Sequence, residues 1–204
     1  MYMNETLWEK AVDFHGHTCM GLVFGYRVVE AAWRVFGERD VDEQYVAIVE
    51  NDNCSIDAIQ VLLSCTLGKG NLIYKDYGKP AYTFIRRKDN KAIRVTLLDP
   101  PDENRDIIRA LREKVDAGQA SETEKELLKT KSEEQIAAYR SRPLEEICKV
   151  QEVDAEIPER ARLFSSVICT SCGEKVMEPR ARLQNGQIVC IPCSLAYTRG
   201  WGTA

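Results

Sequence analysis

Two cysteine pairs near the C-terminus constrain what this chain can fold into more than any other feature. They read Cys169-Thr-Ser-Cys172 and Cys190-Ile-Pro-Cys193, and the 17 residues 173–189 separate them. A structural Zn²⁺ ion takes four ligands in a tetrahedron, and a Cys-x-x-Cys turn holds two thiolates on one side of a tight knuckle. The spacing therefore predicts a structural zinc site with all four cysteines as ligands.

The residues around the second pair predict the rest of this small module. Asn185-Gly186 is a hairpin signal, with Leu183 and Ile188–Val189 as the expected strands. A short helix is expected to start at Ser194 and run to Tyr197. Knuckle, hairpin and helix together predict a treble-clef or ribbon module over residues 158–204. So small a module buries little surface, so the metal must supply much of its folding free energy. A redox pair or unrelated cysteines would fit the regular spacing poorly.

Composition limits the classes of protein that need consideration. The 204 residues suit one medium domain plus a small one, and 44% hydrophobic residues can fill a core. A net charge of -4 and a pI near 5.4 argue against broad nucleic-acid binding. The N-terminus has no apolar signal segment, and no apolar run is long enough to span a membrane, so a cytoplasmic protein is expected. In that compartment eight cysteines are metal ligands or functional thiols rather than disulfides.

Two helices are predicted in the first third of the chain. In Leu22–Phe36 the apolar residues follow one face, which leaves Arg27, Glu30 and Arg34 on the solvated side. Ser55–Leu67 has an apolar stripe of its own, and Gly68 is expected to close that helix.

Short runs rich in β-branched and aromatic residues predict strands. The last two flank Asp89-Asn90 and should form an antiparallel hairpin. The expected fold class is therefore α+β, with an antiparallel-containing sheet packed against helices. The predicted strands are Tyr45–Glu50, Leu72–Tyr74, Tyr82–Arg87 and Ala92–Leu98.

A third stretch, residues 102–142, is dense in Glu, Lys, Arg and Ala. Ser121 and Glu124 form a capping box for a second helix, and Pro143 ends it. The segment is expected to be an exposed helical hairpin, either simply solvated or packed against a partner subunit. The expected domains are a core over residues 1–153, which includes this helical segment, and the zinc module over residues 158–204.

Both histidines of the chain lie in the string Phe14-His15-Gly16-His17-Thr18-Cys19. If this string is extended, alternate residues share a face, which spaces His15, His17 and Cys19 about 6.6 Å apart in steps of two residues. Cys19 leads into the first predicted helix, and a helix N-terminus favours a thiolate. Ordinary buried or surface histidines are the alternative interpretation.

Cys54 has a similar position, since it ends a predicted strand and starts a predicted helix. Asp57 follows one helical turn later, where a carboxylate can hold an imidazole N–H. Cys65 lies about 16 Å along the same helix and is expected to be a core cysteine. We expect His17, Cys19 and Cys54 to converge on one metal, zinc or another transition metal. His15 and Asp57 are expected to support these ligands without binding the metal themselves.

The sequence resembles a known family, the E-type subunits of formylmethanofuran dehydrogenase. The string Phe14–Gly25 resembles the opening motif of that family, and Cys54–Gln60 and Cys65–Lys79 match its next blocks. The resemblance spans roughly residues 8–98. Met20 stands where the family motif has proline, which changes a turn and removes no ligand.

The resemblance implies an α+β core, a homodimer and a metal site built from the His/Cys motif. It also implies an association with a molybdenum or tungsten enzyme that reduces carbon dioxide onto methanofuran or runs the reverse oxidation. The C-terminal module is similar to the C4 finger of the DksA/TraR type, which often mediates protein contacts, so the similarity does not imply DNA binding.

Two functions from different classes follow. The first is a metal-binding accessory protein of a formylmethanofuran dehydrogenase. The alternative is a stand-alone metal- or thiol-dependent enzyme, in which Cys19 or Cys54 is the nucleophile or open-site ligand. His15 or His17 would then be the acid–base group, and Asp57 the orienting carboxylate. A regulatory or nucleic-acid role of the finger is a third interpretation, which the acidic charge argues against.

Overall fold

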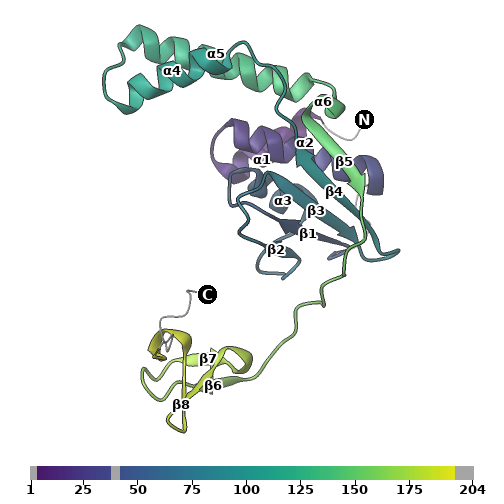
Figure 1. Cartoon of the computed structure of the whole chain (residues 1–204), viewed down its shortest axis with the longest axis vertical. Helices are drawn as coiled ribbons and strands as arrows, with labels where there is room; N and C mark the ends of the chain where they lie inside the picture. Colours follow the sequence, from purple (N-terminus) through teal and green to yellow (C-terminus); the bar gives the residue numbers. More distant parts are fainter. Residues whose placement is uncertain (1–3, 38–41, 196–204) are drawn as a thin grey trace. The chain divides into compact units, whose positions relative to one another are not determined.

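The computed structural model describes residues 4–37 and 42–195 (Figure 1). The chain divides into two compact units, residues 1–160 and residues 161–204, and each is described by itself. The first unit extends seven residues beyond the core expected from the sequence, because residues 153–157 pack against its sheet. Its helices are α1 (Glu5–His15), α2 (Met20–Phe36), α3 (Ser55–Leu63), α4 (Arg105–Asp116), α5 (Glu122–Ser141) and α6 (Leu144–Ile147).

A five-stranded sheet forms the centre of the first unit, in the order β2-β1-β3-β4-β5. Strands β1 and β2 are parallel, and the other neighbours are antiparallel. The α+β class and the β3–β4 hairpin are confirmed, whereas β5 was not expected from the sequence. The strands are β1 (Tyr45–Val49), β2 (Leu72–Tyr74), β3 (Ala81–Arg86), β4 (Lys91–Leu97) and β5 (Cys148–Glu152).

Strand alternation divides the apolar residues between the two faces of the sheet. Ala47 and Val49 of β1 belong to the main core, which α1, α2 and α3 cover. Val46 belongs to a smaller cluster on the other face, together with Ile85 and Ala92. Residues that follow β5 pack on this second cluster and shield it: Val153, Ala155 and Ile157.

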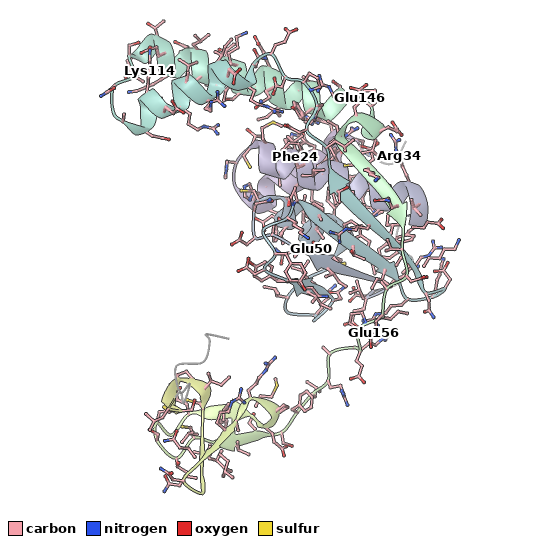
Figure 2. All side chains as sticks on the ribbon, in the orientation of Figure 1. Phe24, Arg34, Glu50, Lys114, Glu146 and Glu156 are labelled. Carbon is pink, nitrogen blue, oxygen red and sulfur yellow. The ribbon has the colours of Figure 1, made fainter. Side chains whose placement is uncertain are left out.

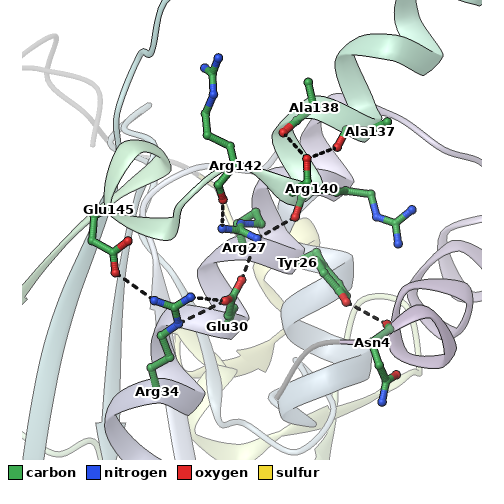
Figure 3. Close-up of polar contacts among 11 residues, drawn as sticks. Asn4, Tyr26, Arg27, Glu30, Arg34, Ala137, Ala138, Arg140, Arg142 and Glu145 are labelled. Carbon is green, nitrogen blue, oxygen red and sulfur yellow. Dashed lines mark hydrogen bonds and ion pairs between the residues drawn. The ribbon is translucent and has the colours of Figure 1, made fainter. Parts of the chain in front are cut away.

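Part of the face of α2 that was expected to be solvated is buried, whereas Arg34 on the same face is exposed, as predicted. Arg27 is 6% exposed and Glu30 is 9% exposed. Arg27 donates to the carbonyl oxygens of Arg140 (2.8 Å) and Arg142 (2.6 Å) (Figure 3). These bonds supply partners for carbonyl groups at the C-terminal end of α5, which have none within the helix. Glu30 pairs with Arg27 at 3.0 Å and with Arg34 at 2.7 Å. The helical period shows where charges lie on α2, but it does not show that α5 covers them.

Helices α4 and α5 form the expected antiparallel hairpin. The capping box of Ser121 and Glu124 is present. Figure 2 shows Lys114 at the end of the hairpin away from the sheet, where it pairs with Glu124 at 2.5 Å. The hairpin meets the core through an edge-on contact of Phe24 with Tyr139, whose ring centroids are 5.7 Å apart.

Helix α3 ends four residues before the expected position. Ser64 takes a left-handed conformation (φ 58°), which stops the helix after Leu63. The Asn71 side chain stabilises the loop, because it donates to the Ser64 carbonyl at 3.2 Å and accepts from the Thr66 amide at 2.9 Å. Cys65 therefore lies in this loop rather than on the helix, and it is fully buried, as a core cysteine should be.

The second unit contains two strand pairs. The hairpin expected around Asn185-Gly186 is confirmed, since both residues have positive φ (50° and 76°). The other pair was not expected. Ser194 and Leu195 are not helical, and the remainder of the helix expected after Cys193 lies outside the described residues. The elements are β6 (Ser166–Ile168), β7 (Lys175–Met177), η1 (Glu178–Arg180), β8 (Arg182–Gln184), β9 (Gln187–Val189) and η2 (Ile191–Cys193).

Candidate metal centres

Each cysteine pair of the C-terminal unit forms a knuckle at the end of a strand. Cys169 follows β6, and its carbonyl accepts the amide of Gly173 at 2.9 Å. Cys190 follows β9, and its carbonyl accepts the amide of Cys193 at 3.1 Å. The two knuckles face one another, so that the four sulfur atoms all lie within 4.8 Å of one another.

The sulfur atoms fit a zinc ion. The Sγ atoms of Cys172 and Cys190 are 3.9 Å apart, close to the roughly 3.8 Å that two Zn–S bonds of 2.3 Å subtend in a tetrahedron. Hydrogen bonds from the amides of Cys172 and Cys190 lower the pKa of Cys169 to about 6, which favours the thiolate that a metal requires. The geometry therefore points to a structural zinc.

The core histidines lie where two helices meet. Helix α1, which was not expected from the sequence, ends at His15, and Gly16 caps it in the left-handed conformation (φ 88°). Cys19 is the N-cap of α2, and its Sγ accepts the Leu22 amide at 3.4 Å. The extended conformation expected for this string is therefore wrong. The tight turn between the two helices replaces it and draws the side chains together.

Three donor atoms converge at this turn. The donor atoms of His15, His17 and Cys19 all lie within 4.8 Å of one another, and the two imidazole centroids are 4.4 Å apart. Nε2 of His15 lies 3.5 Å from Sγ of Cys19. Two ligands on one tetrahedral zinc, one nitrogen and one sulfur, lie roughly 3.6 Å apart. Among the described residues, this group and the four finger cysteines are the clusters of three or more potential metal ligands.

Asp57 orients the first of these imidazoles. Its Oδ2 lies 2.7 Å from Nδ1 of His15, and its Oδ1 accepts a hydrogen bond from the side-chain amide of Gln60 at 3.1 Å. A proton on Nδ1 leaves the lone pair of Nε2 directed at Cys19 and at any metal there. Asp57 therefore supports an imidazole, as expected. His15 was expected to support the ligands from outside the donor group, but the structure places it within that group.

Cys54 lies next to this donor group without belonging to its 4.8 Å set. It is the N-cap of α3, and burial followed by the charge and hydrogen bond of Cys19 raises its pKa. Two glycines allow this approach. A Cβ on Gly21 would lie 2.9 Å from Cβ of Cys54, and one on Gly25 would lie 2.2 Å from the Ser55 carbonyl oxygen. The spacing of these glycines, one helical turn apart, is a local sequence signal of close helix packing.

A cavity of about 410 Å³ adjoins the group. His15, Cys54 and Asp57 belong to its lining, so the centre has access to a space that can hold water or a small molecule. The rest of the lining comes from β1, β2, α3 and the loops beside them: Val49, Asp52, Asn53, Ile56, Gln60, Leu67, Leu72 and Tyr74.

Comparison with protein families assigns both parts of the chain. The family model described as FmdE, molybdenum formylmethanofuran dehydrogenase operon, matches residues 14–149. The chain belongs to the FmdE family. The model of the prokaryotic DksA/TraR C4-type zinc finger matches residues 162–199, which contain the four-cysteine knuckles. In the part of the chain that the structure describes, no helix combines the length and the apolar character needed to span a membrane.

Two known proteins are similar to nearly the whole chain. A protein of Archaeoglobus fulgidus, named a probable S-adenosyl-L-methionine-binding protein, is 35% identical over 199 residues. The match covers 92% of this chain and 52% of that protein, so the chain spans about half the length of its curated relative. The crystal structure of a tungsten formylmethanofuran dehydrogenase FmdE-like protein from Syntrophus aciditrophicus superposes with a TM-score of 0.60 at 26% identity. This superposition covers 93% of this chain and 90% of the Syntrophus chain.

Proposed function

We propose that this FmdE-family protein is an accessory protein that holds a transition metal in its core, with the C-terminal zinc as a structural ion. The observation that carries the proposal is the convergence of His15, His17 and Cys19, with Asp57 behind the first imidazole. Two imidazoles and a thiolate suit zinc, and they also suit nickel, iron or copper. The prediction that Cys54 is a ligand stays a prediction, in which it completes the set from the start of α3.

Each residue of the centre has a separate task in this proposal. His15, His17 and Cys19 supply donor atoms, while Asp57 fixes the tautomer of His15. A metal with three protein ligands would supply a Lewis acid with one position free for water or substrate. Cys54, which lines the adjoining cavity, would serve as a fourth ligand or as a thiol that faces a bound molecule.

The proposed partner is a formylmethanofuran dehydrogenase, with the protein acting in the cytoplasm as a homodimer. Membership of the FmdE family and the name of the Syntrophus structure support the choice of partner. The test is size-exclusion chromatography of this protein with purified dehydrogenase subunits from the same source. Co-elution in a fixed ratio is expected, and separate elution at micromolar concentration would contradict an accessory role.

A second candidate function is a stand-alone metal-dependent or thiol-dependent enzyme. The cavity beside His15, Cys54 and Asp57 favours it, because a purely structural metal has no need of an adjoining space. In this case Cys19 or Cys54 is the nucleophile or open-site ligand, and His15 is the acid–base group that Asp57 orients.

Metal counting tests the core metal that the accessory role and a metal-dependent enzyme both require. Mass spectrometry of the purified full chain should find two metal equivalents per chain. Cys19→Ser should lose only the core equivalent, and the matched finger variant Cys172→Ser should lose only the other. A wild-type chain with one equivalent, all of which Cys172→Ser removes, would refute the core site.

A further inference from the structure

The walls of the cavity beside the core centre come from one face of the sheet. In the parallel pair β1–β2, Val49 lies opposite Tyr74, and both residues line the cavity, as does Leu72. Their neighbours Ile48 and Lys75 line a separate space on the other face of the sheet. Strand alternation therefore directs this lysine away from the cavity.

The charged residues of the lining are of one sign. Asp52 and Asp57 are acidic, and none of the described residues that line the cavity is Lys or Arg. The acidic side chains also act on the hydroxyl of Tyr74, at the rim of the cavity. Loss of hydration, then the hydrogen bond and charge of Asp76 and the charge of Asp52, raise the pKa of the Tyr74 hydroxyl.

A metal in the core does not reverse this charge. The Cys19 thiolate and the Asp57 carboxylate already offset both charges of a divalent ion, and a Cys54 thiolate would add one more negative charge. The Asp57 carboxylate is held by His15 and Gln60. Asp52 lies exposed on the rim, where its carboxylate can meet a ligand.

Much of the remaining lining is apolar, beside the polar side chains of Asn53 and Gln60. Val49, Ile56 and Leu72 surround the space, and two side chains at the mouth stay open to water: Leu67 is 68% exposed and Tyr74 is 44% exposed. A flat or branched apolar group would cover both of them on entry, and burial of their surface would supply binding free energy. The tyrosine ring also offers its face to a cation.

We infer that this cavity binds a small molecule that has an apolar portion and no negative charge, with cations bound most tightly. The inference rests on the proposed function only in taking the metal centre as the group that the ligand meets. It assigns the ligand's apolar part to Ile56, Leu67 and Leu72, and its polar or cationic part to Asp52 and Tyr74.

Three probes of similar size and different charge test the inference: benzyltrimethylammonium, benzyl alcohol and phenylmethanesulfonate. None is a strong ligand for zinc. Amide NMR titrations of the metal-loaded full chain report the dissociation constant and the place of binding. The cation should bind most tightly and the sulfonate most weakly, with shifts at residues 52–57 and 72–74.

Two variants separate charge from apolar contact. Asp52→Asn should reduce the preference for the cation over the sulfonate about threefold, the size expected of a partly exposed charge. Leu67→Ala should weaken all three probes by a similar factor, because it removes apolar wall only. Asp106→Asn, the same charge change on α4, is the matched control and should leave all three dissociation constants unchanged.

The outcomes separate this inference from the proposed function. A flat or reversed ranking, shifts confined to other residues, or no shift by any probe overturns the inference while the core metal is still present. Absence of core metal from the same samples, measured by mass spectrometry, overturns the proposed function, and the probe ranking then still decides the chemistry of the cavity.

Discussion

The zinc finger and the proposed core metal site differ in how their donor atoms are brought together. The finger takes all four ligands from two local knuckles, and its buried residues are few: Cys169, Val189 and Cys190. The core group takes its ligands from the end of α1 and the start of α2, with Cys54 beside it on α3. A large apolar cluster between sheet and helices supports those elements independently of any metal.

This difference teaches that a metal centre can be a cause of folding or a product of it. In the finger, binding and folding are the same event, because little else holds the knuckles together. In the core, apolar burial holds α1, α2 and α3 together, and the turn between α1 and α2 then positions the donor atoms. The following experiments test that contrast, from the largest expected effect to the smallest.

Loss of one finger ligand should have the largest effect. Cys169→Ser is expected to remove one zinc equivalent and most of the finger's folding free energy, on the order of 10 kcal/mol in small zinc modules. Hydrogen exchange over residues 166–195 should rise to unprotected rates, while the thermal transition of the core stays in place. Zinc content equal to that of the wild type would refute the assignment.

An ion pair on the second face of the sheet should stabilise the core without any metal. Arg94 binds Glu50 through both of its terminal nitrogens, and this hydrogen-bonded pair lowers the pKa of Glu50. Arg94→Met should cost about 2 kcal/mol at neutral pH, less than for a fully buried pair, because Arg94 keeps some contact with water. Urea unfolding of the full chain measures this loss.

The pH dependence of that loss follows from the direction of the shift. A carboxyl with a lowered pKa in the folded state contributes stability above its unfolded pKa, near 4.5, and loses it as the pH falls through the folded value. The difference between wild type and Arg94→Met should therefore shrink at acidic pH. Arg109→Met, on the exposed surface of α4, is the control, and a loss independent of pH would contradict the role of the pair.

The segment that follows β5 should contribute a smaller amount to the core. A chain that ends at residue 153 should still unfold cooperatively, but it lacks Ala155 and Ile157 and the hydrogen bond from Arg87 to the Pro158 carbonyl. A chain that ends at residue 160 should be about 1.5 kcal/mol more stable in urea. Equal stability would show that the segment adds nothing, and aggregation of both chains would show that the finger completes the core.

Loss of a core ligand should have the smallest effect on folding. In chains that end at residue 160 and are freed of metal, Cys19→Ser should change the unfolding free energy by less than about 0.5 kcal/mol, because serine is a good N-cap. Only the wild-type chain should then take up metal in a titration. A loss of stability as large as in the finger variant would abolish the distinction between the two centres.

Several features were predictable because their signals are local. The β8–β9 hairpin depends on two adjacent residues, Asn185-Gly186, and the α5 N-terminus depends on Ser121 and Glu124, three positions apart. The pairing of β3 with β4 likewise follows from one short turn. The cysteine spacing of the finger belongs to the same class, since each Cys-x-x-Cys knuckle closes over four residues.

The sequence by itself determined these local elements and the presence of a His/Cys string, and the tertiary structure decided what the string can do. His15 meets Asp57 across 42 positions of chain, and Arg27 meets the end of α5 across 113 and 115 positions. Neither contact has a local signal. Both exist because helices separated in sequence pack face to face, with Gly25 against Ser55 setting how closely α2 approaches α3. The turn between α1 and α2 brings the three donor atoms together, and close packing of α3 places Asp57 and Cys54 beside them.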